Sequence, residues 1–166
     1  MPTGKNQIKI LGIDPGFADT GYGVVLRNGS KLNCLDYGSI KTSKTLSLSE
    51  RIEKLEKDLQ QIITKHHPDQ ASVEQLFFCT NIKTAISVAQ ARGVILLTLV
   101  KNKIPLIECT PLQVKQAVTG YGKADKKQIQ QMVKIILGLK EIPKPDDAAD
   151  ALAMAICGAN NLRANN

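Results

Sequence analysis

The 166-residue chain is poor in the residues that mark several classes of protein. It has no Trp, three Tyr and three Phe, so each aromatic side chain is scarce. Its four Cys are scattered and form no C-x-x-C pair, which argues against a zinc site and against a disulfide framework. We expect these thiols to be reduced and buried. The two histidines, His66 and His67, end a predicted helix before Pro68, and we assign them no function.

Long apolar runs are also missing. The longest run, residues 94–100, is interrupted by Thr98 and is far shorter than the roughly 20 residues that a membrane-spanning helix needs. Residues 1–7 are polar and contain no apolar core of a secretory signal. The composition, 43% hydrophobic and 22% charged, is typical of a globular protein. We therefore expect one soluble, cytoplasmic domain over residues 1–166, with flexible ends at 1–7 and 161–166.

The net charge of +7 is unevenly distributed. Residues 101–144 carry nine Lys against three acidic groups, whereas residues 145–166 carry three Asp against one Arg. A basic segment before an acidic cluster suits a phosphodiester substrate, because lysines can hold backbone phosphates. Ordinary solvated lysines would give the same charge, so composition leaves both interpretations open.

Hydrophobic periodicity predicts five strands and five helices. Asn28-Gly29 between two apolar runs is a strong hairpin signal, and Thr110 followed by Pro111 indicates a helix start. The predicted strands are 8–13, 22–27, 32–40, 70–75 and 105–109, and the predicted helices are 47–66, 80–101, 110–119, 126–137 and 146–161. Three antiparallel strands followed by alternating strands and helices imply an α/β fold, a five-stranded mixed sheet with helices on both faces.

Four acidic residues occupy positions that an ordinary surface carboxylate would not. Asp14 ends the first strand before Pro15-Gly16, and Glu74 interrupts a short buried strand, so both would lose hydration without a partner. Asp147 and Asp150 are three residues apart and therefore share one face of the last helix, which continues as a small-residue apolar stretch. Each acid alone would suit a salt bridge or a cap, but the four together favour a divalent metal site.

The predicted ligands are carboxylate oxygens, with no His-rich or thiolate cluster beside them. Such hard ligands indicate Mg²⁺, with Mn²⁺ as a substitute. Two of these ions about 3.5–4 Å apart can activate a water and stabilise the leaving oxygen in a phosphoryl displacement. The sequence therefore predicts a metal-dependent nuclease centre. Asp146, which precedes these acids in the last helix, is interpreted as a helix cap.

Several blocks of the sequence occur in a specific order. They are Leu11-Gly12-Ile13-Asp14-Pro15-Gly16 with Thr20-Gly21-Tyr22-Gly23, Glu74-Gln75-Leu76-Phe77, Gln90-Ala91-Arg92-Gly93-Val94, Thr110-Pro111-Leu112-Gln113-Val114-Lys115 with Gly120-Tyr121-Gly122, and Asp147-Ala148-Ala149-Asp150-Ala151-Leu152-Ala153. Over nearly the whole chain, these blocks resemble the RuvC family of Holliday-junction resolvases, which have a ribonuclease H-like fold. The first block alone also occurs in other ribonuclease H-like and actin-like proteins, whereas the series is specific.

The resemblance implies a function and a set of site residues. The catalytic, metal-binding acids would be Asp14, Glu74, Asp147 and Asp150. The DNA-binding residues would be Lys115, Lys126, Phe77, Lys123 and Lys127. Members of the family act as homodimers that cut four-way DNA junctions with two symmetric nicks, leaving 5′-phosphate and 3′-hydroxyl ends. The resemblance also implies a partner, a branch-migration helicase complex of the RuvAB type.

Physical reasoning supports part of this set. Phe77 and Phe78 are adjacent and cannot both face one core, so one of them could stack on an unpaired base, a contact worth roughly 1–3 kcal/mol. One buried and one half-exposed Phe would explain the pair equally well. The helix over 80–101 is apolar around more than one face, so it is either enclosed in the core or packed against a second subunit. The resemblance favours the second subunit, that is, a dimer. Arg92 in this helix is expected to pair with a carboxylate or a backbone carbonyl and is given no catalytic role.

Three other functions compete with junction cleavage. A nuclease acting on RNA or RNA–DNA hybrids would share the fold and the acids. An actin-like ATPase or sugar kinase would share the first block, but it needs two such domains, for which 166 residues are too few. A catalytically silent junction-binding module would be expected to lack one or more of the four acids, and all four are present.

Overall fold

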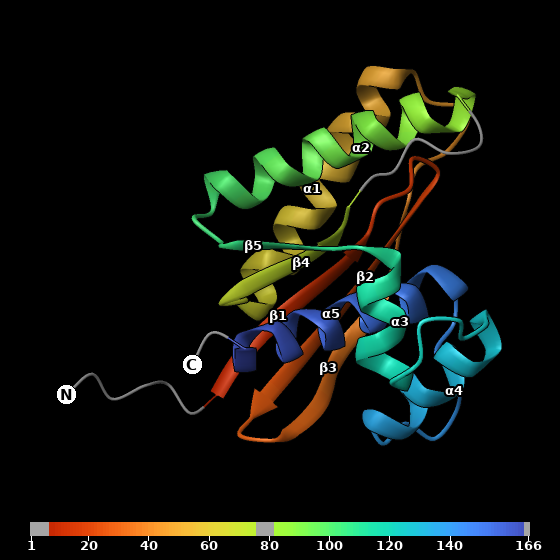
Figure 1. The fold of residues 1–166 in the computed structure, drawn as a ribbon. Coiled ribbons are helices and arrows are strands. Elements are labelled where there is room, and N and C mark those ends of the chain that lie inside the picture. The colour runs from red at the N-terminus through yellow and green to blue at the C-terminus, as the bar shows by residue number, and fades with distance from the viewer. Residues whose placement is uncertain (1–6, 76–81, 165–166) are drawn as a thin grey trace.

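The computed structural model describes residues 7–75 and 82–164 (Figure 1). Within these residues the chain forms five strands and five helices, in the predicted order. They are β1 (Gln7–Asp14), β2 (Asp19–Asn28), β3 (Lys31–Lys41), α1 (Leu48–His66), β4 (Gln70–Glu74), α2 (Ile82–Lys101), β5 (Leu106–Cys109), α3 (Pro111–Thr119), α4 (Lys126–Ile136) and α5 (Asp146–Ala164).

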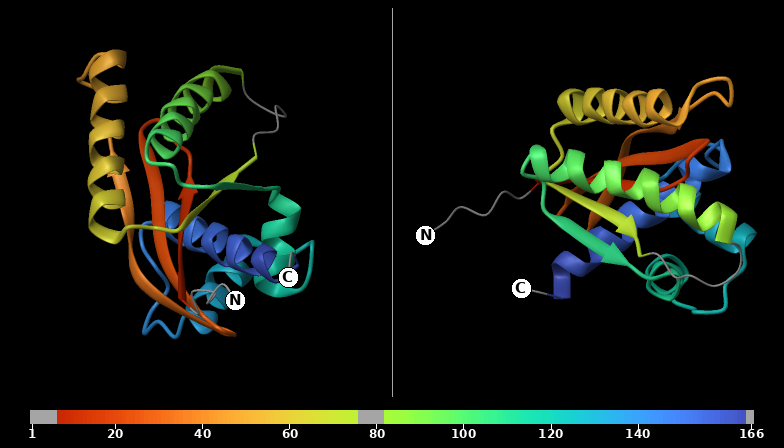
Figure 2. Two further views of the ribbon diagram at one scale, coloured as in Figure 1. Left: turned by 90° about the vertical axis from the view of Figure 1, so that its left-hand side faces the viewer. Right: turned by 90° about the horizontal axis from the view of Figure 1, so that it is seen from above.

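The strands form one mixed sheet in the order β3-β2-β1-β4-β5. β1 pairs antiparallel with β2, and β2 with β3, whereas β4 is parallel to both β1 and β5. Helices α1 and α2 cover one face, and α5 with α3 and α4 covers the other (Figure 2). The predicted mixed sheet with helices on both faces is confirmed. Because β1, β4 and β5 are parallel, their carboxyl ends meet at one edge of the sheet, which is where ligands bind in many α/β proteins.

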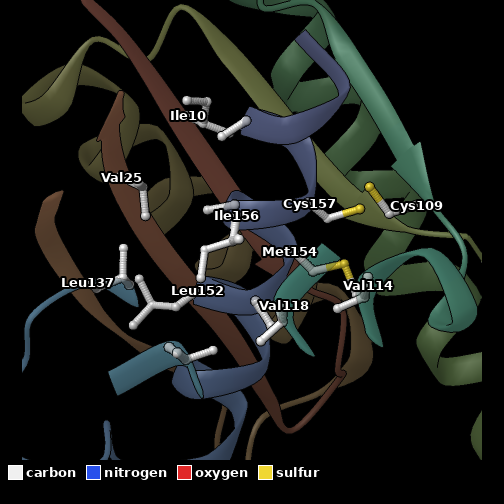
Figure 3. Packing of buried hydrophobic residues seen from close by; sticks show 14 residues of the cluster. Ile10, Val25, Cys109, Val114, Val118, Leu137, Leu152, Met154, Ile156 and Cys157 are labelled. Atoms are coloured by element: carbon white, nitrogen blue, oxygen red, sulfur yellow. The ribbon is translucent and has the colours of Figure 1, made fainter. Parts of the chain in front are cut away.

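Two hydrophobic cores lie on the two faces of the sheet. Alternate residues of β1 enter different cores, as the two-residue period of a strand requires. Ile10 packs with Val25, Leu152 and Ile156 on the side of α5 (Figure 3), whereas Leu11 belongs to the core under α1 and α2. Both faces of the central strand are therefore buried.

Two of the three described cysteines are buried, as predicted, and the third is only half-buried. Cys109 and Cys157 are buried free thiols whose side chains lie next to each other in Figure 3, and Cys34 is a half-buried free thiol. Cys79 lies outside the described residues.

Helix α5 packs unusually close to β1 and β2. A Cβ atom added at Gly12 would overlap the carbonyl oxygen of Ala151, and one added at Gly21 would overlap that of Asp147. Only glycine leaves space for the helix backbone at these two points. Small residues along α5 complete the contact, and the alanines at 148, 149, 151, 153, 155 and 159 are all buried. This close approach places the first turn of α5 beside the end of β1.

Most helix starts are determined by local capping. α1 begins after a capping box of Ser47 and Glu50, as predicted, and α3 begins with Pro111 after Thr110. α4 begins after a capping box headed by Asp125, a role that the sequence analysis did not assign.

The regular elements extend into the ends that the sequence analysis expected to be flexible. β1 begins at Gln7, and α5 continues to Ala164, three residues beyond its predicted end at Asn161. Residue 7 and residues 161–164 therefore belong to regular elements. Near the end of α5, the side-chain amide of Asn160 donates to the Ala117 carbonyl oxygen at 3.2 Å and so ties this part of the helix to α3.

Helix α2 is long and apolar enough to cross a membrane by length and composition alone. It packs on the sheet, however, through Ala91, Ile95, Thr98 and Leu99, which are buried. The helix of a soluble core meets the same criterion, so this observation does not indicate a membrane protein. Its opposite face is exposed and apolar, and is considered below.

Candidate metal centre

Three of the four predicted acids converge at the carboxyl end of β1. One carboxylate oxygen from each of Asp14, Asp147 and Asp150 lies within 4.8 Å of the others. Asp14 is the last residue of β1, and the two other acids lie in the first turns of α5, which the glycine contacts hold against the sheet. The sequence predicted this convergence from strand and helix positions.

Glu74 completes the group from the neighbouring strand β4. It lines the same cleft as Asp14 and Asp150, a space of about 190 Å³, although it is not among the three acids that share the 4.8 Å cluster. The cleft therefore combines the carboxyl ends of two parallel strands with the start of a helix. A larger cleft of about 670 Å³, between the β2–β3 hairpin and the end of α4, contains none of these acids.

The electrostatics of the cleft favour a cation. Burial, together with the charges of Asp150, Glu74 and Asp147, raises the pKa of Asp14 to about 8. The pKa values of Glu74 and Asp150 are also raised, chiefly by burial. Carboxylates that repel one another in a partly dehydrated site are costly unless a positive charge compensates them. Oxygen ligands in this number fit a hard divalent cation such as Mg²⁺ or Mn²⁺.

Lys126, in the first turn of α4, supplies one such charge. Its Nζ lies 3.2 Å from a carboxylate oxygen of Asp146 and 3.5 Å from one of Asp150. Asp146 also accepts a hydrogen bond of 3.2 Å from Gln130, so it links α5 to α4. It is the first residue of α5, and its predicted role as a helix cap stays a prediction. Lys126 thus lies at the rim of the acid cluster, where a substrate phosphate could reach it.

The other predicted DNA-binding residues differ in how the structure places them. Lys115 lines the acid cleft from α3, in the same cleft as Asp14 and Glu74. Lys123 and Lys127 are exposed around the start of α4, next to Lys126 in the chain. Phe77 lies outside the described residues. Lys126 therefore pairs with the acids and Lys115 shares their cleft, whereas Lys123 and Lys127 are exposed nearby in the chain.

One acid near the centre was not selected by the sequence analysis. Asp19, at the start of β2, raises the pKa of Asp147 by its charge, a contribution second only to burial. Its Oδ1 is buried and has no hydrogen-bond partner among the described residues. In the sequence Asp19 is simply a polar residue after a Pro-Gly turn, and only the packing of β2 on α5 reveals its position.

Arg92 makes both kinds of contact that the sequence predicted. Its Nε donates to the carbonyl oxygen of Glu74 at 3.4 Å, and its guanidinium pairs with the Glu108 carboxylate on β5. The contact reaches the main chain of a cleft residue from the opposite face of the sheet.

Comparison with known protein sequences points to a single family. The model of the family described as crossover junction endodeoxyribonuclease RuvC matches residues 10–158. A curated protein of this description from Caldicellulosiruptor saccharolyticus is 56% identical over 151 residues, covering 90% of this chain and 91% of that protein. One from Halothermothrix orenii is 54% identical over 156 residues, covering 94% of each.

Solved structures agree with the sequence comparison. T. thermophilus RuvC in complex with a Holliday junction substrate has a TM-score of 0.90 and 34% identity, covering 95% of this chain and 96% of that one. The yeast mitochondrial Holliday junction resolvase Ydc2 has a TM-score of 0.65 at 17% identity, which supports the fold alone. The sheet order and the matched structures define a ribonuclease H-like fold. The chain therefore belongs to the crossover junction endodeoxyribonuclease RuvC family.

Proposed function

We propose that this protein is a metal-dependent endonuclease that resolves four-way DNA junctions by paired, symmetric cuts in recombination and repair. The observation that carries the proposal is the convergence of Asp14, Asp147 and Asp150, with Glu74 in the same cleft. Such a group, flanked by lysines, suits phosphodiester hydrolysis. Membership of the family supports the four-way junction as the substrate.

The four carboxylates would hold Mg²⁺, in two sites, with Mn²⁺ as a substitute. The bound ions supply activation of a water and stabilisation of the leaving oxygen. Lys115 and Lys126, at the edge of the acid group, attract the phosphate that is to be cut. The water oxygen bonds to phosphorus as the bond between phosphorus and the 3′ oxygen breaks, and the 3′ oxygen takes up a proton. The products are a 5′-phosphate and a 3′-hydroxyl.

The exposed face of α2 supports a homodimer. Ile82, Ile86, Leu97 and Val100 are between 58% and 81% exposed, and their spacing places them on one stripe of the helix. Gly93 lies on the same stripe, and a Cβ added there would meet nothing within 4 Å. A contiguous apolar stripe on a soluble protein marks an interface, and a central glycine lets a second helix approach closely. A symmetric pair of α2 helices would give two active sites for two symmetric cuts.

Other parts of the proposal depend on the family resemblance. Phe77 would stack on a base near the crossover, and Lys123 and Lys127 would contact further phosphates. A branch-migration helicase complex of the RuvAB type would deliver the junction. The protein would act in the cytoplasm.

The test is cleavage of a synthetic mobile four-way DNA junction, with linear duplex and RNA–DNA hybrid of the same sequence as controls, in Mg²⁺ and in EDTA. We expect paired nicks at symmetric positions, in the junction only and in Mg²⁺ only. Cleavage of the hybrid instead would move the protein to another nuclease class with the same acids. Binding without cleavage would indicate a silent junction-binding module.

Asp14→Asn is the matched variant for the metal centre. It removes a charge but little volume, so we expect cleavage to be lost while junction binding in EDTA is unchanged. Retained cleavage would contradict the assignment of Asp14 as a metal ligand.

A further inference from the structure

Within the sheet, the main chain around Glu74 is paired with β5 but not with β1. Glu74 is the last residue of β4, and its registered partner is Cys109 on β5. The following residue, Gln75, donates its N–H to the Cys109 carbonyl at 2.9 Å. On the side of β1 the register ends one residue earlier, at the pair Ile13 and Val73. The main chain of Glu74 therefore lies just beyond the β1 ladder.

Arg92 contacts this main chain from α2. Its Nε donates to the carbonyl oxygen of Glu74 at 3.4 Å, and its Nη2 donates to the carboxylate of Glu108 on β5. The Arg92 side chain is only 16% exposed, so its position is defined by packing. A guanidinium is planar and permanently charged, and its donors form a rigid fork. The Arg92 side chain can thus fix the positions of the ends of β4 and β5 relative to each other.

We propose that Arg92 is a positioning residue of the metal centre, which holds the backbone of Glu74 so that its carboxylate faces Asp14 and Asp150. The inference rests on the proposed function in taking Glu74 as a metal ligand. Glu74 lines the acid cleft together with Asp150 of α5, whereas Arg92 contacts the Glu74 main chain from α2. Helices α2 and α5 lie on opposite faces of the sheet (Figure 2). Arg92 therefore acts through Glu74 and touches neither the ions nor the DNA.

The expected effect follows from the way supporting contacts act in metal sites. Removing a group that orients a metal ligand weakens metal affinity or activity by about 10–100-fold. In Arg92→Ala the end of β4 loses its donor, so the carboxylate of Glu74 samples other directions. We expect metal affinity and kcat to fall by about tenfold, while the Kd for the junction in EDTA stays the same.

The experiment is a double-mutant cycle on the full chain, read by calorimetric titration with Mn²⁺ without DNA. The proteins are wild type, Arg92→Ala, Glu74→Gln and the double variant. We expect Arg92→Ala to raise the Mn²⁺ Kd about tenfold in the wild-type background and by less than about twofold in the Glu74→Gln background. Equal effects in both backgrounds, or none in either, would overturn the proposal, because Arg92 would then not act through Glu74.

Two further variants distinguish loss of the contact with Glu74 from misfolding and from loss of the ion pair with Glu108. Arg92→Lys keeps a positive charge near Glu108, but lysine lacks the planar fork that donates both to the Glu74 carbonyl oxygen and to the Glu108 carboxylate. This variant should fold and should still show a raised Mn²⁺ Kd. It also replaces Arg92→Ala in the cycle if that variant does not fold. Glu108→Gln keeps the donor to Glu74 and should raise the Kd less than either Arg92 variant. A Glu108→Gln effect as large as that of Arg92→Ala would show that the ion pair, and not the contact with Glu74, matters.

Failure of this inference is distinguishable from failure of the proposed function. The Mn²⁺ titration needs no substrate, so it tests Arg92 even if the wild-type protein cuts no junction. Conversely, a wild type that cuts junctions, with Arg92 variants that keep the same kcat and the same Mn²⁺ Kd, would leave the nuclease intact and remove Arg92 from its support.

Discussion

Asp14 has the most perturbed acidity of the four cleft residues. Its pKa of about 8, against an ordinary 3.8, arises first from burial at the end of β1 and then from its acidic neighbours. A group that is held protonated in this way gives up its proton when a cation binds. The structure therefore links metal binding to pH, with Asp14 as the acid whose pKa is raised most.

This link predicts how stability depends on pH without metal. Between about pH 4 and pH 8 the folded protein keeps a proton on Asp14 that the unfolded chain has lost, so the free energy of unfolding decreases as pH rises through this window. Asp14→Asn has no carboxyl group to titrate. We expect its Tm in EDTA to exceed that of wild type by more at pH 8 than at pH 6, as measured by calorimetric melting.

Addition of Mg²⁺ should reverse the order, because the wild type gains a bound ion that the variant holds poorly. Glu53→Gln, on the exposed surface of α1, is the control and should follow the wild-type curve. Parallel curves for wild type and Asp14→Asn in EDTA would show that Asp14 is ionised throughout.

Lys115 gives a second prediction for a single side chain. It lines the acid cleft, so we expect it to contact a substrate phosphate. Lys115→Ala should weaken junction binding and reduce the slope of log K against log salt by about 1, because one fewer counterion is released. The measurement is fluorescence anisotropy over a salt series in EDTA.

The control is Lys57→Ala, which removes an exposed lysine from α1 on the opposite face of the sheet. It should change neither the affinity nor the slope. If both variants reduced the slope equally, the effect would reflect net charge and would not place Lys115 on a phosphate.

Among the elements, α5 matters most, because it carries two of the acids. Its contact with β2 depends on Gly21, which leaves space for the carbonyl of Asp147. Any side chain there must push the first turn of α5 away from the sheet. The distance between Asp14 and the two acids of α5 is thus set by a residue that carries no charge.

Gly21→Ala tests this packing. We expect a loss of about 1–3 kcal/mol in the free energy of unfolding, because a methyl group is forced into a filled space. We also expect kcat to fall by about tenfold or more at a temperature where the variant is folded, since small displacements of reacting groups are costly. Urea unfolding and junction cleavage measure the two effects.

Gly93→Ala is the matched control for folding within one subunit, because a Cβ at Gly93 meets nothing within 4 Å in the single chain. The unfolding free energies of both glycine variants are compared in a Leu97→Glu background, in which a second α2 helix should not approach Gly93. Alanine is also the better helix former by about 1 kcal/mol. The free energy of unfolding of the Gly93→Ala variant should therefore be unchanged or higher. A Gly21→Ala variant as stable and active as wild type would show that α5 can shift without affecting the centre.

In the whole molecule, the exposed stripe of α2 bears on assembly. Leu97 and Val100 lie in the stripe, and both are largely exposed in the single chain. We expect the wild type to have twice the mass of the 18.0 kDa chain and Leu97→Glu to be a monomer, because a buried charge would oppose association. Light scattering with size-exclusion chromatography measures the masses.

Ile135→Glu is the control, since Ile135 is exposed on α4, away from α2. It should remain a dimer. The Leu97→Glu monomer should still bind Mn²⁺ but lose paired cutting, because one subunit carries one active site. A wild-type protein that is a monomer at all concentrations would contradict the symmetric mechanism.

Local features of the fold could be predicted because they depend on a few neighbouring residues. The hairpin at Asn28-Gly29, the capping box of α1 and the start of α3 at Thr110-Pro111 use contacts within four residues, so their sequence signals are direct. The ends were predicted less well. The extension of α5 to Ala164 is not signalled locally, and near this end Asn160 bonds to Ala117, which is far away in the chain.

The sequence was sufficient for the element order and the family, because these depend on periodicity and on ordered motifs. The metal-binding role of the four acids stays a prediction. The tertiary structure was needed for distances and partners. It brought Asp19 beside Asp147 and placed the guanidinium of Arg92 on the main chain of Glu74. The physical reason is that these contacts join elements on both faces of the sheet. They depend on how closely the helices pack, which short-range patterns do not specify.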